Sequence, residues 1–116
     1  MADLQKSAEI LQEAVKTAKY TLLVRQLNKD LNRAGLQENY PEDITPASLE
    51  RSFRAFLYDL IVSDMAVYLN LLYAIDVSER AIKALPANTV DDLATQVTSL
   101  ILTRELKKVK FRDASF

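Results

Sequence analysis

The stretch Phe53–Ile75 reads FRAFLYDLIVSDMAVYLNLLYAI and is the densest apolar segment of this 116-residue chain. Its large apolar side chains recur at steps of three and four residues, which is the period of one face of an α-helix. A start signal precedes it: Thr45 is a suitable N-cap, and Pro46 suits the first helical position, where its missing N–H is not needed. The sequence therefore predicts a helix over about 45–74.

The second half of this predicted helix is apolar on nearly every side. From Met65 to Ile75, Asn70 is the only strongly polar side chain. Such a helix must be covered all round, either at the centre of a bundle or against a partner. Asp59 and Asp64 interrupt the run of about 20 apolar residues that a membrane span requires. We therefore expect a core helix and no membrane span.

The rest of the chain predicts further helices over about 3–34, 77–85 and 90–110, with an acidic loop at 36–45. Gly35 is placed to end the first helix, and Asp76 to Glu79 match a capping box that starts the short one. A helix over 3–34 would be about 45 Å long, too long for a compact domain of this size. We expect it to break near Thr17–Thr21, or to pack its first half against a second copy.

These elements predict an all-α fold in a single domain over 1–116, an up-down helical bundle of three long helices and one short helix. The hydrophobic fraction of 49% and charged fraction of 27% are those of an ordinary globular protein. A single glycine and three prolines provide too few turns for a β-sandwich or barrel.

The amino-acid composition also excludes several classes of function. The chain has no His and no Cys, which excludes disulfides, zinc fingers and catalysis by Ser–His or Cys–His pairs. The formal charge of −1 gives no overall attraction to nucleic acid. Without a glycine-rich phosphate loop or a cluster of metal ligands, we expect no enzyme, cofactor or metal. The N-terminus does not match a signal peptide, so a cytoplasmic location is the default expectation.

Two apolar surfaces favour protein–protein interaction. Three tyrosines spread around the predicted helix suit an interface, although they would also suit the rim of a core. Near the N-terminus, leucine, alanine and valine alternate at steps of four and three in a heptad-like seam. We expect a small interaction module that self-associates, binds a protein partner, or both. The predicted contact residues are Tyr68, Leu69, Leu72 and Tyr73 in the first surface, and Leu4, Leu11 and Val15 in the second.

The end of the last predicted helix offers an alternative function. Its five basic residues stand against only Glu105 and Asp113, a local charge of +3. Such a cluster could contact phosphates of nucleic acid or another anionic partner, but it is also typical of a solvated helix end whose cations favour the helix dipole. The sequence favours the second interpretation. The candidate anion-binding residues are Arg104, Lys107, Lys108, Lys110 and Arg112.

Asp59 and Asp64 could in principle form a catalytic or metal-binding pair. Five positions apart, they do not share a helix face, and no His or Cys accompanies them. We expect them to be structural carboxylates that pair with Arg104 or Lys107 on a neighbouring helix.

Two segments of the C-terminal half resemble known sequences. Leu71–Glu79 (LLYAIDVSE) and Leu100–Lys110 (LILTRELKKVK) are similar to stretches of small all-helical bacterial proteins, of the type found in bacteroidetes, that are known mainly as uncharacterised. The resemblance implies an all-helical, intracellular bacterial protein. It rests on no catalytic or ligand motif and implies no particular activity.

Overall fold

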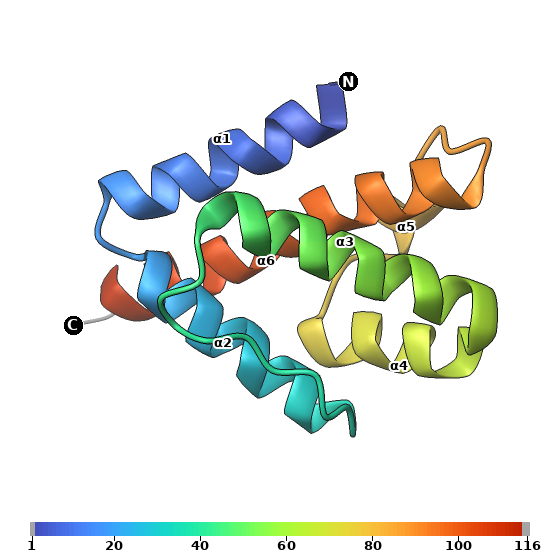
Figure 1. Ribbon diagram of the computed structural model, residues 1–116, viewed down its shortest axis with the longest axis horizontal. Coiled ribbons are helices and arrows are strands. Elements are labelled where there is room, and N and C mark those ends of the chain that lie inside the picture. Colours follow the sequence, from blue (N-terminus) through green and yellow to red (C-terminus); the bar gives the residue numbers. More distant parts are fainter. Residues whose placement is uncertain (1, 115–116) are drawn as a thin grey trace.

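The computed structural model describes residues 2–114, and these form six α-helices and no strand (Figure 1). The Cα radius of gyration is 13.3 Å. The predicted all-α class is confirmed, but the structure has more helices than the expected three long and one short, because two of the predicted long helices are divided. The helices are α1 (Ala2–Lys16), α2 (Tyr20–Arg33), α3 (Pro46–Ser63), α4 (Met65–Ile75), α5 (Glu79–Lys83) and α6 (Val90–Ala114).

Helix α6 lies at the centre of the fold. It contacts α1, α2, α3 and α4, and Figure 1 shows it crossing the molecule behind α3. Val97, Ile101 and Leu102 are fully buried along it, together with the polar side chains of Thr98 and Glu105. The sequence predicted a core helix over about 45–74, either at the centre of the bundle or against a partner. The structure instead surrounds α6, because apolar density alone does not show which helix is surrounded by the others.

The chain leaves helical geometry between α1 and α2 at Ala18, which has a left-handed backbone with φ of 58°. The Lys19 N–H donates to the Ala14 carbonyl at 2.7 Å, and the Ala18 N–H donates to the Val15 carbonyl at 3.1 Å. These two bonds form a Schellman motif, which satisfies the last carbonyls of a helix. Of the two alternatives for residues 3–34, the structure therefore shows the break near Thr17–Thr21.

The expected continuous helix over 45–74 is wrong, because the chain breaks at Asp64. The Asp64 side chain accepts a hydrogen bond from the Val67 N–H at 3.2 Å and so caps the start of α4. Aspartate competes in this way with the helical backbone, which is why it favours helix ends. A single residue thus separates α3 from α4. The predicted start of α3 is confirmed, since Thr45 Oγ1 accepts from the Ser48 N–H at 3.2 Å.

The remaining helix ends follow the same chemistry. Gly35 has a φ of 81° and ends α2 as expected, in a second Schellman motif. Asp76 does not start a capping box: it has a left-handed φ of 66° and ends α4. Ser78 caps α5 instead, by accepting from the Ala81 N–H at 3.3 Å, so α5 is shorter than the predicted 77–85. Helix α6 begins at Val90 as predicted and extends past 110.

The left-handed alanine makes the α1–α2 break testable. We expect Ala18→Gly to raise the free energy of unfolding by about 0.5–1 kcal/mol, because glycine adopts this backbone without the steric cost that a Cβ imposes. Urea denaturation of both proteins measures the difference. The control is Ala8→Gly at an exposed position inside α1, which should lower the stability by about 0.5–1 kcal/mol. A loss of stability in Ala18→Gly would contradict the observed break.

Candidate protein-interaction surface

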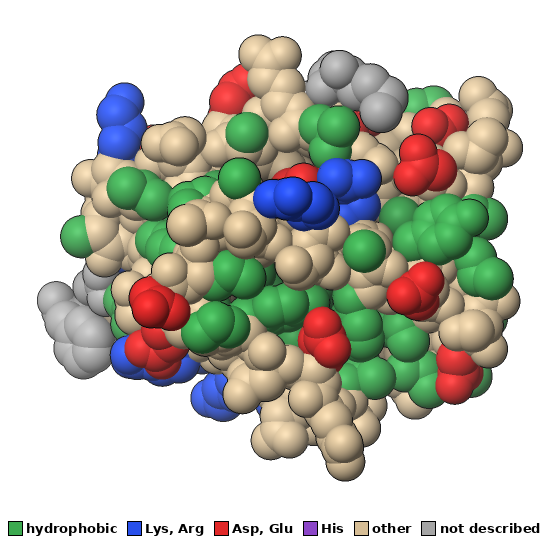
Figure 2. Space-filling model, viewed as in Figure 1, with side chains coloured by type: hydrophobic (Ala, Val, Ile, Leu, Met, Phe, Trp, Pro, Cys, Tyr) green, Lys and Arg blue, Asp and Glu red, His purple; other side chains and the backbone are tan. Residues whose placement is uncertain are grey.

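Helix α4 exposes a row of large apolar side chains. Met65, Leu69 and Tyr73 follow one another at four-residue intervals along one side of the helix, and they are 50%, 54% and 89% exposed. Val62, in the last turn of α3, is 61% exposed. Figure 2 shows hydrophobic side chains gathered over the end of the molecule where α3 passes into α4. We call Val62, Met65, Leu69 and Tyr73 together the α4 face.

A hollow of about 200 Å³ lies beside the α4 face. It lies between α4 and the segment that carries α5, and its walls are apolar except for one carboxylate. A side chain of a docked partner could enter a hollow of this kind, since small apolar pockets accept anchor residues at interfaces. The lining residues are Leu69, Leu72, Tyr73, Val77, Glu79 and Ile82.

The structure exposes two of the four contact residues that the sequence predicted in this region and buries the other two. Leu69 and Tyr73 are exposed, as a contact surface requires, but Tyr68 and Leu72 are buried in the hydrophobic core. Tyr68 is therefore not available to a partner, and that part of the prediction is wrong, whereas Leu72 could contact a partner only within the hollow that it lines. Sequence reasoning missed Met65, although its four-residue spacing from Leu69 would have placed it on the same side of the helix.

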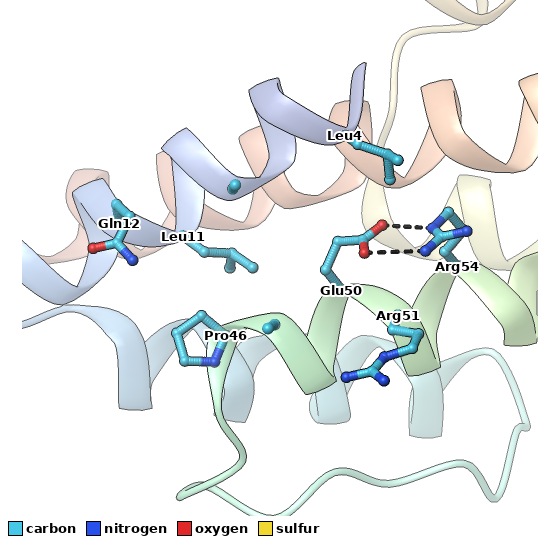
Figure 3. Close-up of a pocket in the computed structure, with 9 residues that line it drawn as sticks. Leu4, Leu11, Gln12, Pro46, Glu50, Arg51 and Arg54 are labelled. Carbon is cyan, nitrogen blue, oxygen red and sulfur yellow. Dashed lines mark hydrogen bonds and ion pairs between the residues drawn. The ribbon is translucent and has the colours of Figure 1, made fainter. Parts of the chain in front are cut away.

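The second predicted surface, the seam of α1, is used largely within the chain. Leu11 is buried in the core, and Leu4 is half-buried. Figure 3 shows both side chains in the space between α1 and α3, where a hollow of about 350 Å³ lies. Opposite them, Arg54 Nε lies 2.7 Å from Glu50 Oε2. Of the three predicted contact residues of the seam, Val15 is the exposed one. The expectation that Leu11 contacts a partner is therefore wrong, because α1 turns this residue toward its own chain, whereas Leu4 is half-buried at the hollow.

The basic end of α6 is not a patch of free cations. Three of the five predicted anion-binding residues form ion pairs with carboxylates of other helices or of the turn after α4. Lys107 and Arg112 are exposed. The expected pairing of Asp59 and Asp64 with Arg104 or Lys107 is wrong, because Arg104 pairs with Asp76 and neither Asp59 nor Asp64 forms an ion pair with a described residue. The observed pairs are Arg104–Asp76 at 3.0 Å, Lys108–Asp30 at 2.7 Å and Lys110–Glu13 at 3.1 Å.

A buried polar cluster joins α2 to α6, and the sequence did not predict it. The side chains of Asp30 and Glu105 are fully buried. Lys108 Nζ lies 2.7 Å from Asp30 Oδ2 and 3.2 Å from Glu105 Oε1, and Gln26 Nε2 donates to Asp30 Oδ1 at 3.2 Å. The available signal was the position of Asp30 between Leu27 and Leu31, on the side of α2 that carries its apolar residues.

Burial raises the pKa of Glu105 from its ordinary value of 4.5 to about 8, because an ionised carboxylate is poorly solvated inside the protein. The neighbouring Asp30 carboxylate raises this pKa further, and the Lys108 ammonium opposes it. Glu105 is therefore protonated at neutral pH. Because the cluster connects Asp30 of α2 with Glu105 and Lys108 of α6, we interpret it as a structural link between these two helices.

In the part of the chain that the structure describes, no group of three or more acidic side chains is arranged to hold a metal ion. None of the described helices combines the length and the apolar character needed to cross a membrane.

The raised pKa of Glu105 predicts a pH-dependent stability. The folded protein keeps this proton up to about pH 8, whereas the unfolded chain releases it near its ordinary pKa of 4.5. The stabilising contribution is thus complete below about pH 4.5, and the free energy of unfolding should fall as the pH rises from about 5 to about 8.

Glu105→Gln carries no such proton, so it should remove most of this decrease and be more stable than the wild type above about pH 8. Urea denaturation across this pH range measures the effect. Glu9→Gln, at an exposed position of α1, is the control and should keep the wild-type dependence. The same slope in Glu105→Gln as in the wild type would contradict the assignment.

Comparison with models of protein families, with curated proteins and with solved structures found no match to this chain.

Proposed function

We propose that this protein is a small helical interaction module that binds a protein partner through the α4 face. The observation that carries the proposal is the row formed by Val62, Met65, Leu69 and Tyr73, each at least half exposed. Single exposed hydrophobic residues are normal on a protein surface, but a contiguous apolar patch is typical of an interaction site.

The composition of the α4 face suits a protein partner. Tyrosine is enriched among the residues that contribute most to binding, because its large ring buries much surface with few rotatable bonds. Tyr73 is the most exposed large hydrophobic residue of the described chain and lines the hollow beside α4. Helix α4 itself has no charged side chain, so a partner that covers it does not have to remove a charge of α4 from water.

Anion binding through the basic end of α6 is the weaker alternative. Arg104, Lys108 and Lys110 already pair with carboxylates of their own chain. An incoming phosphate would have to compete with these carboxylates, and in the case of Lys108 with a fully buried one. The proposal assigns the protein no catalytic activity.

The proposal predicts that Leu69→Ser/Tyr73→Ser loses its partner. We expect the wild-type protein to capture a stoichiometric protein from a bacterial lysate and the double variant to bind that protein at least about tenfold more weakly, which corresponds to about 1.4 kcal/mol. Both positions are exposed, so the stability should change by no more than about 0.5 kcal/mol.

The matched control is Val15→Ser/Phe111→Ser, which removes two exposed apolar side chains from other helices. This control should bind like the wild type. Equal capture by the wild type and Leu69→Ser/Tyr73→Ser would overturn the proposed site, and capture of nucleic acid that Lys107→Glu abolishes would favour the alternative.

A further inference from the structure

The charges in the segment around the α4 face are unbalanced. Between Arg54 and Arg80, the sequence contains four acidic residues and no Lys or Arg. Figure 2 agrees: at the end of the molecule where α3 passes into α4, this view shows Asp and Glu side chains beside the hydrophobic ones, and no Lys or Arg. The four acidic residues are Asp59, Asp64, Asp76 and Glu79.

Two of these carboxylates are already neutralised by the chain. Asp76 pairs with Arg104 at 3.0 Å, and Glu79 pairs with Lys83 at 3.4 Å. Asp59 and Asp64 form no ion pair with any described residue and are exposed. Asp59 lies one turn before Val62, and Asp64 directly precedes Met65, so both flank the same end of the α4 face. Negative charge is thus left without an ion-pair partner where α3 passes into α4.

At the other end of the α4 face, the hollow is not lined by a charged side chain that lacks an ion-pair partner. Arg33 of α2 lies beside Tyr73 but is 3.6 Å from the buried Asp30 carboxylate. Arg80 is exposed on α5 but does not line the hollow, whose charged side chain is Glu79. A second copy would present the same α4 face, and the segment between Arg54 and Arg80 that carries it has no Lys or Arg to pair with Asp59 and Asp64.

We infer that the partner is a basic amphipathic helix, which docks its apolar side on the α4 face and places Lys or Arg beside Asp59 and Asp64. The inference rests on the proposed function and adds the chemical class of the partner. An amphipathic helix laid in an apolar surface is an established form of recognition, with anchors at three- and four-residue steps. Helix α4 is about 16 Å long, so a segment of about 11–14 residues matches it.

Two synthetic helical peptides of about 14 residues test this inference. They share the same Leu and Phe positions, and one carries Lys where the other carries Glu. Fluorescence anisotropy with the full chain should show the Lys peptide binding at least about tenfold more tightly than the Glu peptide, with a difference that shrinks at high salt.

Variants of the protein then show where the Lys peptide binds. Asp59→Asn/Asp64→Asn should weaken the Lys peptide by about three- to tenfold, and asparagine keeps the cap of α4 because it caps helices as well as aspartate does. The matched control, Glu9→Gln/Asp43→Asn, removes two exposed carboxylates elsewhere and should bind like the wild type. Leu69→Ser/Tyr73→Ser should abolish binding.

Three results would overturn the inference while leaving the proposed function in place. The first is equal binding of both peptides in a manner that depends on Leu69 and Tyr73. The second is binding of neither peptide by a protein that still captures its lysate partner through these residues. The third is a dimer in light scattering that Leu69→Ser/Tyr73→Ser abolishes, since the occupant would then be a second copy. Failure of the proposed function is distinct, because lysate capture would then not depend on Leu69 and Tyr73.

Discussion

The fold depends on the burial of α6 on several sides at once, since α1, α2, α3 and α4 all contact this one helix. A helix in that position needs small side chains where neighbours approach closely, and buried hydroxyl groups need hydrogen-bond partners. Thr98 meets both needs, because its Oγ1 donates to the Ala94 carbonyl one turn earlier at 2.7 Å. Further along, Glu105 and Lys108 meet Asp30 of α2. Polar contacts and the surrounding leucines thus both stabilise the centre of the fold, while the most apolar helix, α4, lies at the side.

Much of the fold could be predicted from local chemistry, and its centre could not. The left-handed Gly35, the Thr45 cap and the break near Thr17–Thr21 follow from residue type, position and the length of a helix relative to the domain. The break at Asp64 did not follow, because an aspartate within an apolar run can either stay helical or cap a new helix, and Asp59 does the first. Which helix is surrounded depends on contacts between distant segments, and the amphipathic pattern of one segment does not contain that information.

The same limit explains the outcome at the candidate site. Helix α4 is apolar on nearly all sides, so its own sequence could not show which side the other helices cover. Tyr68 and Leu72 are covered, whereas Leu69 and Tyr73 are not. The cluster of Asp30, Glu105 and Lys108 escaped prediction for a related reason: Asp30 and Lys108 are 78 positions apart, and no local pattern joins them.

The exposed side of α4 has an apolar composition that its packing does not require. The core uses Tyr68, Leu71, Leu72 and Ile75, and a helix that served only the core would tolerate polar residues on its other side. Large apolar residues stand there instead, in a row that begins at the break between α3 and α4. Asp64 makes that break and carries a charge with no ion-pair partner among the described residues. Asp64 therefore separates α4 from α3 and also adds a negative charge beside the α4 face. We relate both the geometry of α4 and the expected positive charge of its partner to this one residue.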